Sequence, residues 1–357
     1  MRNRLFIAIA LLSLAALPLA GQAAKSSIPR MPDGHPDLQG TYDLATITPM
    51  ERLPGDPPFL TKEKAEALQK AELARRAEDN KPSKADRPAP PVGGVNTPPK
   101  SFFEILERAG GGAVGGYNRF WLNQGTQYTV VDGQIRTSIV IDPANGHVPA
   151  YNAIAQKRMA AARNATPTSD QRENNDPTSE PPGAFDNPEQ RPLGERCLLG
   201  FGSTSGPPAL PDYFYNDLHQ IVQTPNSIMI LTEMVHDARI VRMNAQHLPK
   251  NIRRWMGDSV GHWEGDTLVV DTTNFNDKTR FRGATDNLHV IERFTRLDDK
   301  TLLYRFTVED PETWDKAWTG EYTWPVTEKP IYEYACHEGN YALADILRGA
   351  RTQEGSK

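Results

Sequence analysis

His236, Asp237 and Arg239 stand almost side by side in the sequence, and their side chains could perform acid–base chemistry. An imidazole titrates near neutral pH, a neighbouring carboxylate can orient it, and a guanidinium can stabilise a negative charge that develops during a reaction. These residue types therefore indicate a possible catalytic group. The same residues flank a predicted turn, so a position at the solvated rim of a sheet is the alternative.

Two turns decide which side chains share a sheet face with this group. A two-residue turn at Pro225-Asn226 places His219 opposite Thr232, and a turn at Asp237-Ala238 places His236 opposite Arg239. The shared face is rich in apolar residues and consists of His219, Ile221, Ile230, Thr232, Met234, His236, Arg239, Val241 and Met243. Burying histidine and arginine is costly unless they are paired, so this face predicts a functional pocket.

A second hairpin offers a buried carboxylate under one of two registers. A three-residue loop at Asp298-Asp299-Lys300 puts Glu292 among aromatic residues, where its pKa would rise and it could act as an acid or base. A four-residue loop leaves Glu292 solvated and turns His289 and Ile291 inward instead. The sequence alone leaves both registers open.

These arguments define a set of candidate site residues. The predicted catalytic residues are His236, Asp237, Arg239, His289 and Glu292. The predicted substrate-binding residues are Arg282, Tyr304, Phe306, Tyr322 and Trp324.

Several other kinds of site are not indicated. The chain has no glycine-rich phosphate loop, no Gly-x-Ser-x-Gly elbow and no His-Glu-x-x-His helix, and its eight histidines lack ligand spacing. We therefore predict no cofactor, and no metal unless a site arises by tertiary convergence. The net charge of -5, with mixed signs, argues against a nucleic-acid partner.

The candidate residues lie on predicted β-strands. After Cys197, short runs rich in branched and aromatic residues alternate with turn residues. The predicted strands are 218–224, 227–236, 239–243, 267–273, 288–297, 301–309, 318–324 and 331–336. The pattern is typical of a mainly β fold, an antiparallel meander closed into a lipocalin-like barrel or stacked as a sandwich, with peripheral helices and long loops.

The amino-terminal third is organised differently. Met1-Arg2-Asn3-Arg4, a following apolar run and small residues before Ala24 predict a signal peptide over residues 1–23, cleaved after Ala23. A retained anchor is the alternative, but such anchors usually need about 20 apolar residues. Residues 24–116 form a proline-rich segment with a surface helix that begins after Thr61 and a flexible linker over 78–100.

Residues 117–357 form the predicted β-rich domain. It contains a hairpin around Asp132-Gly133-Gln134, a long polar excursion over 160–192, and a short carboxy-terminal helix over 342–350 laid against the barrel. Export exposes Cys197 and Cys336 to an oxidising compartment, so we expect them to form a disulfide, with two separate buried thiols as the alternative.

Several stretches carry a resemblance to a known group of proteins. They are Arg136-Thr137-Ser138-Ile139-Val140-Ile141-Asp142-Pro143, Glu195-Arg196-Cys197-Leu198, Ile221-Val222-Gln223-Thr224-Pro225, His236-Asp237-Ala238-Arg239, the run from Trp263 to Thr273, and Tyr334-Ala335-Cys336-His337-Glu338-Gly339-Asn340-Tyr341. With them the chain resembles a widespread, functionally uncharacterised family of exported bacterial β-rich proteins. The resemblance implies export but no reaction. Gly40-Thr41-Tyr42 also resembles the Gly-x-Trp first strand of lipocalin-like barrels.

Three functions fit these observations. The first is a periplasmic or secreted enzyme, a lyase, isomerase or hydrolase, that uses acid–base chemistry on a small apolar, aromatic or sugar-like molecule. The second is a lipocalin-like protein that binds such a molecule without turnover. The third is a structural protein of the cell envelope. None of them requires membrane insertion after the leader is cleaved.

Overall fold

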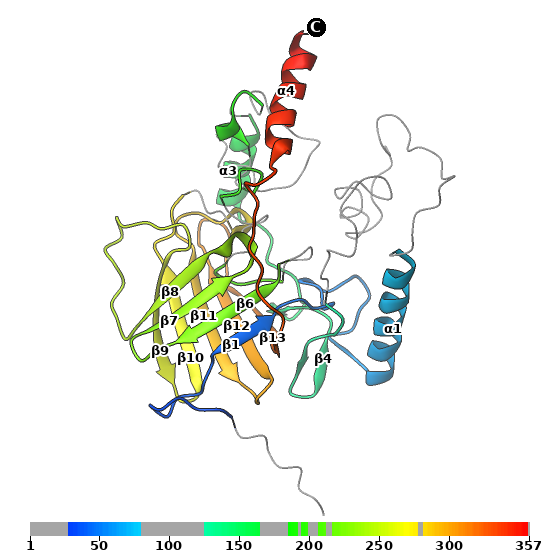
Figure 1. Cartoon of the computed structure of the whole chain (residues 1–357), viewed down its shortest axis with the longest axis vertical. Coiled ribbons are helices and arrows are strands. Elements are labelled where there is room, and N and C mark those ends of the chain that lie inside the picture. Colours follow the sequence, from blue (N-terminus) through cyan, green and yellow to red (C-terminus); the bar gives the residue numbers. More distant parts are fainter. Residues whose placement is uncertain are drawn as a thin grey trace, which may run out of the picture.

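A computed structural model of the chain describes residues 28–79, 125–164, 185–191, 194–198, 206–211, 216–277 and 281–355. The described chain is mainly β, and nine strands close into a barrel (Figure 1). The strand order is β1-β6-β7-β8-β9-β10-β11-β12-β13, and β13 pairs back with β1. The prediction of a β-barrel with peripheral helices is confirmed.

The elements have the following bounds. The barrel strands are β1 (Gly40–Asp43), β6 (Leu218–Gln223), β7 (Ser227–Thr232), β8 (Ala238–Met243), β9 (Asp258–Glu264), β10 (Thr267–Thr273), β11 (His289–Arg296), β12 (Thr301–Glu309) and β13 (Trp318–Thr327). The remaining strands are β2 (Phe59–Leu60), β3 (Val130–Val131), β4 (Gln134–Arg136) and β5 (Val140–Asp142). The helices are α1 (Lys62–Asp79), α3 (Ala153–Asn164) and α4 (Tyr341–Gly355), with short turns η3 (Pro188–Gln190), η5 (Met234–His236) and η6 (Phe281–Gly283).

One strand pair breaks the predicted antiparallel meander. Strands β8 and β9 run parallel, so residues 244–257 must cross from one end of the barrel to the other. Strand β9 was missing from the sequence prediction because Gly261 interrupts its apolar pattern. A Cβ at Gly261 would lie 2.8 Å from a methyl group of Val241, so the close approach of β8 and β9 favours glycine there.

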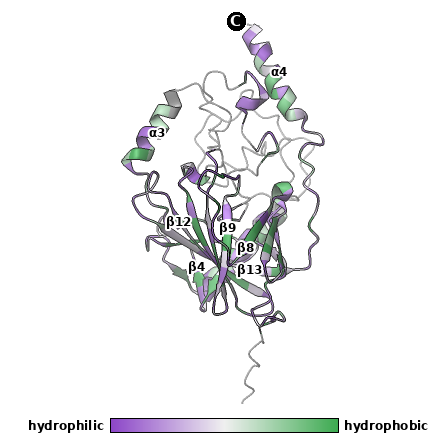
Figure 2. Cartoon of the chain, turned by 90° about the vertical axis from the view of Figure 1, so that its left-hand side faces the viewer, coloured by the Kyte–Doolittle hydropathy of each residue, from purple (hydrophilic) through white to green (hydrophobic). Residues whose placement is uncertain are grey.

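Large aromatic side chains fill the barrel. Alternate residues point inward on each strand, and the buried rings are Tyr42, Phe294, Tyr304, Phe306, Trp318, Tyr322 and Trp324. Gly320 lies opposite Phe306, and a Cβ there would lie 2.3 Å from the ring. The interior is therefore built from ring contacts, such as the 4.5 Å centroid separation of Tyr304 and Trp324. Figure 2 shows apolar residues along the barrel strands beneath α3 and α4.

At one end of the barrel, Arg296 links the loop between β11 and β12 to the first strand. Arg296 donates hydrogen bonds to the Tyr42 hydroxyl at 2.7 Å and to the backbone oxygens of Asp298 and Asp299 at 2.8 and 2.7 Å. Leu38, in the segment that leads into β1, is fully buried beside this arginine. Gly40-Thr41-Tyr42 thus forms the first barrel strand, and its tyrosine lies under a cation.

A three-stranded sheet packs beside the barrel. Its order is β2-β4-β3, and Arg136 of β4 donates to Glu321 of β13 at 2.7 Å. The predicted hairpin exists, but it is closed by Asp132 and Gly133 because Val131 pairs with Gln134. Helix α1 lies outside this sheet (Figure 1), and Thr61 caps it by accepting a hydrogen bond from the Lys64 N–H.

The carboxy-terminal prediction is partly wrong. Residues 331–336 form no strand, and α4 extends away from the barrel instead of lying against it (Figure 1). The apolar pattern of 331–336 is short, and the disulfide rather than strand pairing fixes this segment. Cys197 and Cys336 are bonded, with their Cα atoms 5.7 Å apart, which confirms the predicted disulfide.

Several sequence predictions concern residues that lie partly or wholly outside the described ranges. The residues of the predicted signal peptide, and most of those of the predicted linker over 78–100, lie outside the described residues. The first part of the predicted excursion, residues 160–164, continues α3, and 165–184 lie outside the described chain. Among the described residues, no helix has both the length and the apolar character to cross a membrane.

Candidate functional site

Glu292 lies inside the barrel, as the three-residue loop register predicts. Strand β11 pairs with β12 so that Glu292 is opposite Phe306 and Phe294 is opposite Tyr304. The carboxylate is 0% exposed. The alternative register, with His289 inside, is excluded by this pairing.

A buried ion pair holds this carboxylate. Arg239 of β8 donates from Nη1 to Oε2 of Glu292 at 2.5 Å and from Nη2 to Oε1 at 2.8 Å. The Tyr304 hydroxyl donates to Oε1 at 2.8 Å. Both carboxylate oxygens are therefore engaged, in the bidentate geometry that gives arginine–carboxylate pairs their strength.

Hydroxyl groups of the intervening strands β9 and β10 lie beside the ion pair. Arg239 Nη1 also lies 3.4 Å from the Ser259 hydroxyl, which lies 2.9 Å from that of Thr272. Burial and the adjacent charge of Glu292 raise the pKa of Tyr304 well above its usual value, so this phenol stays protonated. We define Arg239, Ser259, Thr272, Glu292 and Tyr304 as the interior cluster.

His219 is a second polar group of the interior. Its Nε2 lies 3.1 Å from the Thr232 hydroxyl, in the register predicted from the Pro225-Asn226 turn. Burial lowers the pKa of His219 to about 4, and the positive charge of Arg239 acts in the same direction, against a raising hydrogen bond with the backbone of Asp217. The imidazole is therefore neutral near pH 7.

A segment from outside the barrel strands reaches the interior cluster. The Ala209 N–H donates to the Tyr304 hydroxyl at 2.9 Å, and the Tyr322 hydroxyl donates to the Ala209 carbonyl at 3.0 Å. Ala209 is buried in the hydrophobic core, and Leu210 packs against it. We call Gly206–Pro211 the plug segment.

Three buried indoles of the core lack acceptors. The N–H groups of Trp314, Trp318 and Trp324 find no hydrogen-bond partner within the described chain, and two of these rings, those of Trp318 and Trp324, lie on β13 inside the barrel. Trp324 also lies against Tyr304 and His219, with ring centroids 4.5 and 5.5 Å apart. An unsatisfied buried donor costs roughly 1–3 kcal/mol, so these two groups call for an acceptor from elsewhere.

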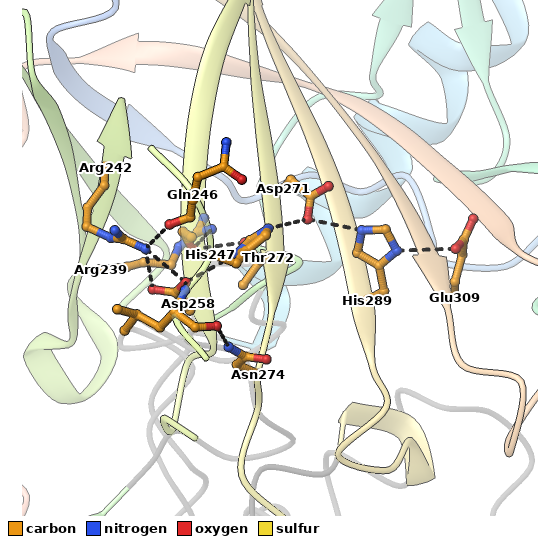
Figure 3. A network of polar contacts seen from close by, with 12 residues as sticks. Arg239, Arg242, Gln246, His247, Asp258, Asp271, Thr272, Asn274, His289 and Glu309 are labelled. Carbon is orange, nitrogen blue, oxygen red and sulfur yellow. Dashed lines mark hydrogen bonds and ion pairs between the residues drawn. The ribbon is translucent and has the colours of Figure 1, made fainter. Parts of the chain in front are cut away.

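A different polar network covers the outside of the same strands (Figure 3). His289 Nε2 and His247 Nε2 each lie 3.1 Å from the same oxygen of Asp271. The Nδ1 atoms face Glu309 and Asp258, each at 3.2 Å. Arg242 ends the row with 3.0 Å contacts to Asp258. We define these six residues as the outer chain.

The outer chain is partly open to solvent. The side chains of His289 and Asp271 are 29% and 36% exposed. The hydrogen bond with Asp271 is the largest cause that raises the pKa of His289, and Glu309 adds to it. Burial raises the pKa of Asp271, but the contacts with the two histidines outweigh it and leave that pKa below its usual value. An imidazole with a carboxylate at each nitrogen satisfies both only when it is doubly protonated.

The predicted catalytic group does not assemble. His236 is exposed in the turn between β7 and β8, whereas Arg239 is 5% exposed inside the barrel. The predicted opposition of His236 and Arg239 is wrong, because Ile230 pairs with Arg239. The chain leaves the strand after Thr232 through a turn in which Val235 and His236 adopt positive φ angles of 61° and 47°. The β-branched Val235 gives no sequence signal for such a turn, because β-branched residues seldom adopt positive φ angles.

The other candidates divide between the two sides of the barrel wall. Tyr304, Phe306, Tyr322 and Trp324 line the interior as predicted. His289 points outward into the outer chain. Arg282 is exposed at η6, where its backbone oxygen accepts from Tyr151, and Asp237 lies between η5 and β8.

Sequence reasoning missed several residues of both networks. Ser259 lies on the unrecognised β9, and Ala209, which contacts the interior cluster, carries no side-chain signal for a polar role. Asp271 and His247 come together only through the parallel β8–β9 crossover, which local pattern does not reveal. Alternation of Asp271 with the inward Val270 and Thr272 was the one available clue.

The comparisons add no relative. No family model matches the chain, and neither the curated proteins nor the solved structures contain a significant match to it. Within the described residues, no group of three or more His, Cys, Asp or Glu side chains is arranged to hold a metal ion. The resemblance to an uncharacterised exported family therefore stays a prediction, and function must be argued from the barrel itself.

Proposed function

We propose that this chain is an exported barrel protein that binds a small, uncharged molecule with an aromatic or alicyclic body next to the interior cluster. One observation carries the proposal: the buried N–H groups of Trp318 and Trp324 lack acceptors among the described residues, while the charged and phenolic groups of the neighbouring interior cluster are paired. A ligand oxygen would supply the missing acceptor. The surrounding rings would pack against the ligand body.

The charge balance of the interior supports an uncharged ligand. Arg239 and Glu292 neutralise each other, and His219 is neutral near pH 7. A charged ligand would add an uncompensated charge to a buried site, which is costly. The hydroxyls of Tyr304 and Tyr322 favour a ligand with neutral polar atoms instead.

Binding is favoured over the acid–base catalysis expected from the sequence. A catalytic acid or base needs a position from which it can reach the substrate. Both oxygens of Glu292 are engaged by Arg239 and Tyr304, and His236 lies outside the barrel. The acid–base enzyme remains the competing function, and it makes a different prediction in the same assay.

Export is part of the proposal. The Cys197–Cys336 disulfide supports folding in an oxidising compartment, the periplasm or outside of the cell. Mass analysis of protein secreted by its own leader should find a chain that begins at Ala24. A mature chain that begins before Leu19 would contradict cleavage.

Fluorescence tests the ligand site with neutral naphthyl probes, N-phenyl-naphthylamine and naphthyl acetate. We expect saturable energy transfer from the buried indoles to the oxidised, full mature chain. The ester supplies an acceptor oxygen, so Trp324→Phe should weaken its binding roughly tenfold, the effect of one lost hydrogen bond. Trp255→Phe is the matched control, because Trp255 is 42% exposed.

Two results would count against the proposal. If neither probe binds, or if Trp324→Phe and Trp255→Phe behave alike, the barrel interior is not the ligand site. If naphthyl acetate is hydrolysed, and Glu292→Gln abolishes hydrolysis without unfolding the chain, the acid–base hydrolase is the better description.

A further inference from the structure

The plug segment contacts the interior cluster as a ligand would. Its Ala209 offers one donor and one acceptor to two barrel hydroxyls, those of Tyr304 and Tyr322. Both hydroxyls come from neighbouring inward positions of β12 and β13, which pair directly at these two residues. The barrel therefore presents a pair of hydroxyls with a fixed spacing, and a backbone residue fits that pair.

The contact involves one backbone donor and one backbone acceptor, both from Ala209. The N–H and the carbonyl belong to the same residue, so the recognised unit is an acylated amine, one carbon and a carbonyl. Pro207 and Pro208 have no N–H, so in the plug segment the first backbone donor after Gly206 is that of Ala209. The Ala209 side chain adds only a methyl group. Recognition at this point therefore depends on backbone groups that many molecules could supply.

We propose that the plug segment occupies the ligand site of the barrel, and that the external ligand is an uncharged α-acylamino carbonyl compound that displaces Ala209. This inference rests on the proposed function and names its ligand class. The ligand N–H would donate to Tyr304, and the ligand carbonyl would accept from Tyr322. An aromatic substituent next to the carbonyl would lie against the rings of Trp324 and Phe306.

Competition with the plug segment has a measurable consequence. A ligand binds only those molecules in which the site is vacant. Its apparent association constant is therefore the intrinsic constant multiplied by the vacant fraction. The two hydrogen bonds of Ala209 are each worth only about 1 kcal/mol net. Removing one of them should therefore raise the apparent affinity of the external ligand.

The test uses two probes that differ in a single N–H group. They are N-acetyl-alanine naphthylamide and its N-methyl derivative on the alanine nitrogen, titrated into the oxidised mature chain. Ala209→Pro removes the plug donor and should raise the apparent affinity for the first probe roughly tenfold. Ala209→Gly, which retains both backbone groups, is the control and should change it much less.

The second comparison examines the barrel hydroxyls. In Ala209→Pro, the N–H probe should bind roughly tenfold more tightly than the N-methyl probe, and Tyr304→Phe should remove that preference. Tyr322→Phe should weaken both probes alike, because both retain the carbonyl. Hydrogen exchange of the wild-type chain should increase at Ala209 when the N–H probe is added, which checks displacement without any variant.

The outcomes separate the two proposals. If neutral naphthyl probes bind but Ala209→Pro matches Ala209→Gly and the N-methyl group has no effect, the displacement proposal is wrong and the binding function stands. If no probe binds the wild type or any folded variant, the binding function itself is wrong. Protected exchange at Ala209 with bound probe would also refute displacement.

Discussion

The two sides of strand β11 handle charge in opposite ways. Glu292 points inward and is held by a guanidinium and a phenol, whereas His289, three residues earlier, points outward between two carboxylates. The inward carboxylate has a partner that stays charged at every physiological pH. The outward carboxylates beside His289 are paired with an imidazole that carries a charge only while it is protonated, and their contacts raise its pKa. The alternation of side chains along β11 thus places a permanent ion pair on the inward face and part of the titratable outer chain on the outward face.

The same contrast separates two histidines. His219 is inside, and burial lowers its pKa to about 4, whereas hydrogen bonding to Asp271 raises the pKa of His289 outside. Acidification therefore destabilises the folded state through His219 and stabilises it through His289. It forces a proton into the interior at His219 and completes the hydrogen bonds of His289.

The largest effect should come from breaking the interior ion pair. Glu292→Ala leaves the Arg239 guanidinium buried without a counter-charge and should lower the free energy of unfolding by about 3–5 kcal/mol. The double variant Arg239→Met/Glu292→Leu removes both charges and should recover most of that loss. Urea unfolding measures both. A double variant that is as unstable as Glu292→Ala would show that the pair itself, and not the stranded charge, matters.

His219 should give the next largest effect, and only at acid pH. Its native pKa of about 4 lies below the unfolded value near 6.5, so its contribution is complete above pH 6.5 and is lost as the pH falls towards 4. About 3 kcal/mol is at stake. We expect the difference in unfolding free energy between wild type and His219→Gln to shift by this amount in favour of the variant. Parallel stability curves from pH 7 to pH 4 would contradict a buried neutral His219.

Tyr304 should have a smaller effect that is independent of pH below its raised pKa. Tyr304→Phe removes the donor to Glu292 and the acceptor of the Ala209 N–H and should cost about 1–3 kcal/mol. Tyr332→Phe is the matched control, because that side chain is 68% exposed. If thermal unfolding shows equal losses for both variants, the interior hydrogen bonds of Tyr304 contribute no stability.

The residue types in two turns explain why the sequence could predict the inward-facing residues of the barrel. Pro225-Asn226 and Asp298-Asp299-Lys300 contain residues that fix loop length, so the registers of β6–β7 and, as one of two options, β11–β12 followed from them. Those registers placed His219 and Glu292 on the inward face. Alternation then identified Tyr304 and Trp324 as their neighbours.

The remaining features depend on contacts that local pattern does not record. The turn after Thr232 places Val235 and His236 in the left-handed region, which a β-branched valine seldom adopts, so the predicted position of His236 was wrong. The outer chain requires the parallel crossover that brings His247 beside Asp271. The plug segment acts through its backbone, which every residue carries.

The outer chain should give the smallest effect, with a pH dependence opposite in sign to that of His219. The pKa of His289 is raised in the folded chain, so its stabilisation is fully present below the unfolded value near 6.5 and is lost as the pH rises through the folded pKa. Because the side chains are partly exposed, solvent screening limits the contribution to less than about 1 kcal/mol. His289→Gln should therefore be less stable than wild type at pH 5 and should approach it at pH 8, as measured by urea unfolding.

His262→Gln is the control for this experiment. Within the described chain, His262 pairs only with the exposed Glu264 and has no second carboxylate at its other nitrogen. If the difference in unfolding free energy between wild type and His289→Gln is constant across this range, the outer chain stabilises the fold through packing and not through the proton on His289.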